Sequence, residues 1–120
     1  RNYVYQHNKP LDINKMKEAI KYFEGQHDFT SFVSSEDERE NKVRTIIKTD
    51  IKKKKDIIEI SFQADGFMKY QVRNMVGLLI KIGENQFKPE SVKDILDKKD
   101  RTSASITANA EGLYLKDVRY

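Results

Sequence analysis

Cysteine is absent from this sequence of 120 residues, so disulfide bonds and thiolate chemistry have no part in its function. Histidine is nearly absent: His7 and His27 are the only two, and no cluster has the ligand spacing of a zinc site. No apolar run approaches the roughly 18 residues that cross a membrane, and no signal peptide is visible. These absences argue against disulfide-rich, zinc-binding and membrane-spanning proteins, and they suit a cytoplasmic one.

Charged residues, in contrast, are plentiful. They make up 35% of the chain, against 38% for apolar residues, and the formal net charge is +4. Basic side chains are concentrated between residues 42 and 55, where Asp50 is the one acid; they are Lys42, Arg44, Lys48, Lys52, Lys53, Lys54 and Lys55. Such a run attracts phosphate groups, although a solvated hairpin is an equally good interpretation.

Hydrophobic periodicity predicts four strands and three helices in a single domain. The strands are expected at residues 2–6, 43–51, 58–64 and 113–120, and the helices at 12–23, 67–83 and 89–96. The face of the second strand that enters the core is expected to carry Val43, Thr45, Ile47, Thr49 and Ile51. Residues 26–32 are expected to form a turn, and residues 34–42 and 100–112 to form loops. This order predicts an α+β fold, in which helices pack on one face of an antiparallel sheet and leave the other face free.

The helix expected at residues 67–83 is apolar almost all round, yet Arg73 and Asn74 lie in its middle. A helix of this kind is usually buried, and a buried arginine needs an acidic or hydrogen-bonding partner. Gly77 follows Arg73 by one turn and leaves room for a backbone or a ligand to approach the guanidinium. The partner is either a structural acid of this chain or a group supplied from elsewhere. The structural candidates are Asp28, Asp65 and Asp100.

Five segments carry recognisable motifs in a fixed order. They are residues 25–32 (Gly-Gln-His-Asp-Phe-Thr-Ser-Phe), 43–46 (Val-Arg-Thr-Ile), 67–77 (Phe-Met-Lys-Tyr-Gln-Val-Arg-Asn-Met-Val-Gly), 100–102 (Asp-Arg-Thr) and 108–115 (Ala-Asn-Ala-Glu-Gly-Leu-Tyr-Leu). Together they resemble the bacterial tRNA pseudouridine synthase A family over essentially the whole chain. The resemblance implies an enzyme that isomerises uridine to pseudouridine in the anticodon stem-loop of tRNA. It also implies a homodimer that needs no metal and no organic cofactor.

The family's catalytic aspartate belongs to an Arg-Thr-Asp-x-Gly-Val-His motif, which this sequence does not contain. The resemblance therefore identifies residues 1–120 as the C-terminal domain of such a synthase, without the N-terminal half that carries the aspartate. It implies that the isolated fragment is inactive. By the same resemblance, Arg73 is the arginine that pairs with the missing aspartate, and Leu113 packs against the target base in the active-site pocket.

The remaining candidate residues have weaker support. His27, Asp28 and Phe29 are expected to be architectural, because no set of nucleophile, base and orienting group is evident around them. Contact with the tRNA backbone is expected for the basic hairpin, namely Arg44, Lys48, Lys52, Lys53, Lys54 and Lys55. Two alternative functions stay open, a non-catalytic RNA-binding module and a dimerisation module.

Overall fold

The computed structural model describes residues 2–6, 10–33, 40–55, 57–68, 71–99 and 113–116, the first and last of these as backbone only. Within these described ranges, nine elements follow one another. They are β1 (Asn2–Gln6), α1 (Ile13–Lys21), β2 (Gly25–Asp28), the 3-10 turn η1 (Thr30–Phe32), β3 (Val43–Lys54), β4 (Ile57–Ala64), α2 (Gln71–Gly83), α3 (Ser91–Lys98) and β5 (Leu113–Lys116).

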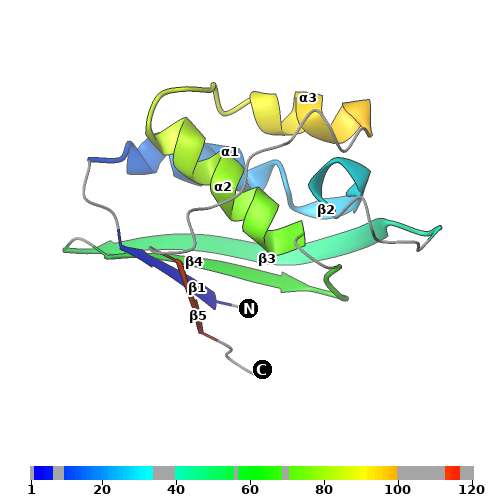
Figure 1. The fold of residues 1–120 in the computed structure, drawn as a ribbon, viewed down its shortest axis with the longest axis horizontal. Helices are drawn as coiled ribbons and strands as arrows, with labels where there is room; N and C mark the ends of the chain where they lie inside the picture. Colours follow the sequence, from blue (N-terminus) through cyan, green and yellow to red (C-terminus); the bar gives the residue numbers. More distant parts are fainter. Residues whose placement is uncertain are drawn as a thin grey trace.

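The strands form one antiparallel sheet in the order β2-β3-β4-β1-β5. The described helices α1, α2 and α3 lie on one face of this sheet (Figure 1). No described helix covers the other face. The α+β class and the one-sided packing predicted from the sequence are therefore confirmed.

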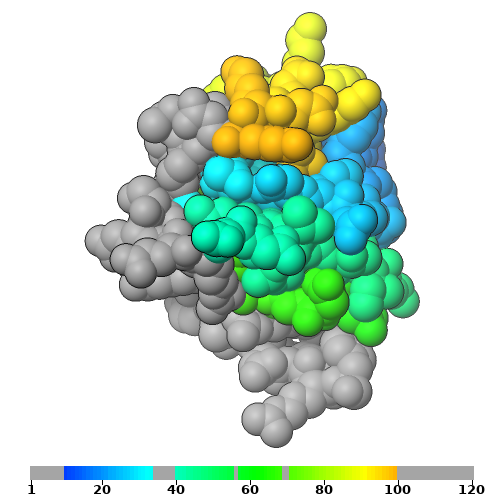
Figure 2. Space-filling model, turned by 90° about the vertical axis from the view of Figure 1, so that its right-hand side faces the viewer, coloured from blue at the N-terminus to red at the C-terminus, as the bar shows by residue number. Residues whose placement is uncertain are grey.

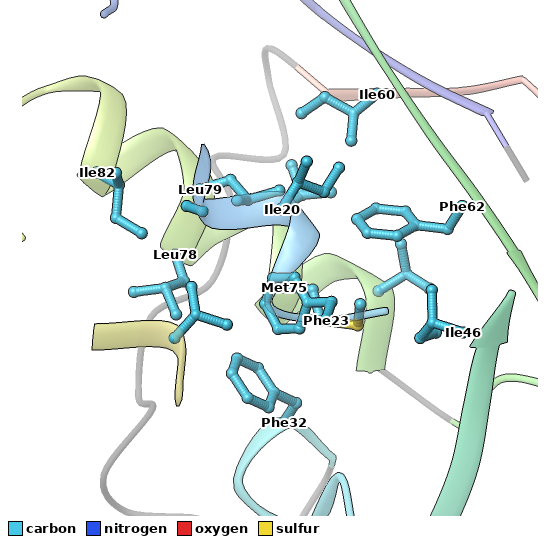
Figure 3. Packing of buried hydrophobic residues seen from close by; sticks show 14 of the residues in the cluster. Ile20, Phe23, Phe32, Ile46, Ile60, Phe62, Met75, Leu78, Leu79 and Ile82 are labelled. Carbon is cyan, nitrogen blue, oxygen red and sulfur yellow. The ribbon is translucent and has the colours of Figure 1, made fainter. Parts of the chain in front are cut away.

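The core between the helices and the sheet is built around aromatic rings. Phe23, which follows α1, makes edge-to-face contacts with Phe32 of η1, at 5.3 Å between ring centroids, and with Phe62 of β4, at 6.3 Å. Met75 of α2 is buried beside them (Figure 3). Because one ring follows α1 and the other two belong to η1 and β4, this cluster fixes the end of α1, η1 and the sheet relative to one another.

The first residues of α1 are tied to the last residue of α2. Asp12 caps α1 by accepting a hydrogen bond from the Lys15 N–H at 3.2 Å. The Asp12 N–H in turn donates to the Gly83 carbonyl at 2.8 Å. Met16 and Ile20 of α1, one turn apart, are both buried. The two helices are thus joined through backbone as well as through side chains.

One part of the predicted alternation along β3 is wrong. The sequence pattern places Ile47 in the core, but its side chain is 58% exposed and Ile46 is buried instead. The pairing with β4 shifts register between Ile46 and Lys48, as in a β-bulge. The inserted residue resets the alternation, so that Thr49 and Ile51 enter the core as predicted.

The turn predicted at residues 26–32 is in part a strand. Gly25 takes a positive φ of 100° after α1, and β2 then pairs with β3 from Gly25 opposite Ile46 to Asp28 opposite Val43. Phe29 and Phe32 are buried after it, as predicted. Most of the loops expected at 34–42 and 100–112 lies outside the described residues, and α2 begins at Gln71.

Candidate functional site

The first turn of α2 is held by a buried glutamine. The Gln71 side chain accepts a hydrogen bond from the Met68 N–H at 2.9 Å, while the Gln71 N–H donates to the Met68 carbonyl at 3.1 Å. This reciprocal pair is the glutamine half of a capping box, and it satisfies backbone groups that the start of a helix leaves open. Gln71 is fully buried, so the amide has no water to exchange with.

A second buried amide joins this turn to η1. Asn74 is 1% exposed, and its Nδ2 donates to the Phe32 carbonyl at 2.8 Å, across 42 residues of sequence. The Phe32 ring is itself fixed by Phe23 and Phe29. The start of α2 is therefore attached to a rigid part of the core.

Arg73 lies between these two anchors and is half-buried. Within the described residues its guanidinium makes no hydrogen bond and no ion pair. Two of its three candidate structural partners bond elsewhere: Asp28 accepts from the N–H and hydroxyl of Thr30, and Asp65 accepts from the Thr45 N–H at 3.0 Å. The third, Asp100, lies outside the described residues.

His27 and Asp28 are engaged in local structure. The Nε2 atom of His27 lies 2.8 Å from the Glu24 carbonyl, which can only accept, so this nitrogen carries the proton. The imidazole also meets Phe29 edge-on, at 5.9 Å between centroids. Burial raises the pKa of Asp28. Hydrogen bonds from Thr30 and the charges of Lys99 and Lys42 lower it by more than burial raises it, so the net pKa lies below its usual value.

The edge of the sheet at β2 carries an open hollow. Figure 2 shows this side, with the end of α3 above β2 and β3 below it. The hollow has a volume of about 340 Å³ and is lined by Gln26, His27, Asp28, Val43, Leu96, Asp97 and Lys99. Its lining mixes acids with a lysine, and none of its described groups forms a set suited to nucleophilic catalysis.

The basic hairpin distributes its side chains over both faces of the sheet. Lys48 and Lys52 share the uncovered face, where they line a hollow of about 320 Å³ with polar residues of β4. The cross-strand pairs there are Lys48 with Gln63, Asp50 with Ser61 and Lys52 with Glu59. Lys53 pairs with the buried Ile58, which places it in the opposite phase. The run of lysines in the sequence is therefore not one patch.

Two further basic residues of the predicted RNA-binding set lie apart from this face. The Arg44 guanidinium is hydrogen-bonded to nearby backbone: its Nη1 donates to the carbonyls of Val43 at 2.7 Å and Asn41 at 3.2 Å. Lys55 forms the turn of the hairpin with a φ of 55°. Leu113 begins β5, and its side chain lies outside the described part of the chain.

Metal and membrane sites are not found in the described parts of the chain. No group of three histidine, aspartate or glutamate side chains among them is placed to hold a metal ion. None of the described helices is both long and apolar enough to span a bilayer.

Comparison with known proteins gives the family. A family model described as tRNA pseudouridine synthase matches residues 19–120. The chain belongs to the tRNA pseudouridine synthase family. Its curated relatives include tRNA pseudouridine synthase A of Pseudothermotoga lettingae, 46% identical, tRNA pseudouridine synthase A 1 of Bacillus cereus, 43% identical, and tRNA pseudouridine synthase A of Streptococcus pneumoniae, 44% identical. Each match covers 100% of this chain and 49% of the relative, so the chain spans about half the length of these synthases.

Sequence reasoning singled out Arg73 but not the function of the amides beside it. Gln71 and Asn74 are three residues apart and hence on one side of the helix. Two amides at this spacing in an otherwise apolar helix are the feature from which the anchoring could have been predicted. A fully buried amide must be hydrogen-bonded, and such a pair indicates that the helix face is anchored to other backbone.

Proposed function

We propose that this chain is the C-terminal half of a tRNA pseudouridine synthase that acts on the anticodon stem-loop, as a homodimer in its complete form. The relatives that it matches are named tRNA pseudouridine synthase A and are about twice as long. The half-buried Arg73, without an acidic partner in the described chain, is the observation that supports this proposal most directly. Its partner is an aspartate on the other half.

The proposed role of Arg73 follows from the chemistry of the reaction. Such synthases attack a flipped-out nucleotide with an aspartate, detach the uracil, turn it and reattach it through carbon. The bond from the sugar to N1 of uracil breaks and a bond from the sugar to C5 forms, while C5 loses a proton and N1 gains one, so the step needs no oxidant or reductant. A guanidinium beside the aspartate keeps it ionised and fixes its direction, because arginine stays charged and offers a planar set of donors. Leu113, the first residue of β5, is proposed to pack against the base.

Substitution of Arg73 in the complete enzyme tests this proposal. We expect Arg73→Ala to abolish pseudouridine formation, because the aspartate loses its partner, while the dissociation constant for tRNA stays within a few fold. Tritium release from labelled uridine in tRNA measures turnover, and filter binding measures affinity. The matched control is Lys81→Ala, which removes a basic residue from the last turn of the same helix, where it pairs with Glu84 at 3.8 Å. Normal turnover by Arg73→Ala contradicts the assignment.

Contact with the tRNA backbone is proposed for the uncovered sheet face. Lys48 and Lys52 lie on this face and Lys53 does not, although it is adjacent in sequence. We expect the double variant Lys48→Ala/Lys52→Ala to weaken tRNA binding and to lower the slope of log K against log salt by about one to two, since each phosphate contact contributes roughly 0.7 to 0.9. Lys53→Ala is the control and should leave the slope unchanged. Equal effects of Lys52→Ala and Lys53→Ala would show that the run acts only through its net charge.

The alternative functions make different predictions for the chain by itself. A non-catalytic RNA-binding module binds tRNA appreciably in the absence of the other half, and a dimerisation module forms a tight dimer without affinity for RNA. Analytical ultracentrifugation of residues 1–120 with and without tRNA separates them. The synthase assignment predicts weak binding, because most of the binding surface belongs to the missing half.

A further inference from the structure

Gln71 and Asn74, on the other side of the same helical turn, determine the direction in which Arg73 leaves α2. Successive residues of an α-helix are about 100° apart, so residues 71 and 74 share one side and residue 73 projects well away from it. Gln71 and Asn74 are both fully buried, and Arg73 is half-buried. Holding the amide side in place therefore sets the direction in which the Cα–Cβ bond of Arg73 leaves the helix.

The group that accepts the Asn74 hydrogen bond is itself held on several sides. The ring of Phe32 packs against Phe23 and Phe29 in the core. The neighbouring Ser31 hydroxyl donates to the Ile95 carbonyl of α3 at 2.8 Å. The rings of Phe23 and Phe29 thus hold the acceptor independently of α2, and the Ser31 bond is a separate link from the same turn to α3.

We infer that Asn74 is a positioning residue of the synthase: it ties the first turn of α2 to η1 and thereby aims Arg73 at the aspartate of the other half. This inference rests on the proposed function, because it assumes that Arg73 pairs with that aspartate. Without the Asn74 bond the turn keeps its capping by Gln71 but loses the hydrogen bond that ties it to η1. The guanidinium then samples a wider range of directions, which lowers the fraction of enzyme with the aspartate correctly oriented.

Kinetics of the complete enzyme test this inference. We expect Asn74→Ala to lower kcat on the order of 10- to 100-fold, since displacements of about 1 Å in an active site have effects of this size. The KM for tRNA should stay within about threefold, because no contact with RNA is removed. Thermal melting shows whether Asn74→Ala is folded under assay conditions. If it is unfolded, Asn74→Ser is measured instead.

Ser31→Ala is the matched control. It removes a buried side-chain hydrogen bond to a backbone carbonyl, of the same 2.8 Å length and from the same turn, but one that leads to α3. Both variants should melt at a lower temperature, whereas kcat of folded Ser31→Ala should stay within about twofold of the wild type. Equal kcat losses in the two variants, or a normal kcat for Asn74→Ala, overturn the positioning role. Arg73→Ala keeps the two proposals separate: if it is inactive while Asn74→Ala is normal, the synthase assignment stands and only the positioning role fails.

Discussion

Gly83, the last residue of α2, shows how the lack of one side chain permits the close approach of two helices. A Cβ atom at this position would lie 2.6 Å from Sδ of Met16 and 3.2 Å from Cδ2 of Leu11. Met16 is fully buried and cannot turn away into solvent. The backbone bond from Asp12 to Gly83 holds the two helices at this separation.

Gly83→Ala is therefore expected to destabilise the protein by about 1–2 kcal/mol, because the overpacking exceeds the gain in helix propensity. Urea denaturation measures the change. Gly66→Ala is the control, since the atom nearest to its added Cβ is Nε of Arg44 at 3.7 Å, an ordinary contact. Equal stability of the two variants would mean that Met16 and Leu11 repack without cost.

For single residues, the sequence predicted which positions are unusual but not their partners. Arg73 and Asn74 are conspicuous in an apolar helix. The Phe32 carbonyl that binds Asn74 is 42 residues away in sequence. Any backbone carbonyl in the core could accept this hydrogen bond, so the sequence does not indicate which one does. The partner proposed for Arg73 came from the motif, and chemistry alone left Asp28, Asp65 and Asp100 as candidates.

At the scale of elements, a carboxylate joins the end of α1 to β3. Glu24 accepts hydrogen bonds from the N–H and the hydroxyl of Thr49, at 2.9 and 2.6 Å, and pairs with Lys21 at 3.1 Å. Burial raises the pKa of Glu24, but the bonds from Thr49 and Lys21 together lower it below its ordinary value of 4.5. The folded state thus favours the charged carboxylate.

The sign of the pH dependence follows from this shift. A carboxyl whose pKa is lower in the folded state contributes stability above its unfolded pKa, and the contribution is lost as the pH falls through the folded value. We expect Glu24→Gln to lower the free energy of unfolding by about 1 kcal/mol at pH 7. The difference from the wild type should shrink below pH 4.5. Asp50→Asn, which removes an exposed pair with Lys52 at 3.9 Å, should change little at either pH. A Glu24→Gln effect that stays constant down to pH 3 would contradict the linkage.

The elements that the sequence missed owe their form to their neighbours. β2 contains Gly25, Gln26, His27 and Asp28, none of them a strong strand former, and it exists because it pairs with β3. The bulge in β3 was hidden because Ile46 and Ile47 are both apolar, so either satisfies an alternating pattern. β4, in contrast, alternates without interruption, and Ile58, Ile60 and Phe62 are buried as predicted.

At the scale of the molecule, the proposed function predicts that the catalytic aspartate and its arginine lie on different halves of the synthase. Residues 1–120 by themselves should form no pseudouridine in unmodified tRNA, because the family's aspartate motif is not among them. Mass spectrometry of tRNA after incubation with the purified chain is the measurement, and the complete enzyme is the positive control. Measurable turnover by the chain would show that its nucleophile lies within these residues.

The pairing of the first and last strands has a consequence for engineering. Asn2 at the start of β1 lies opposite Lys116 at the end of β5, so the polypeptide enters and leaves the sheet at neighbouring positions (Figure 1). Units with adjacent entry and exit points tolerate transplantation into a host loop and relocation of their termini. A circularly permuted version, with Asn2 and Lys116 bridged by a short glycine-rich linker and new ends opened after Lys55, should keep this architecture.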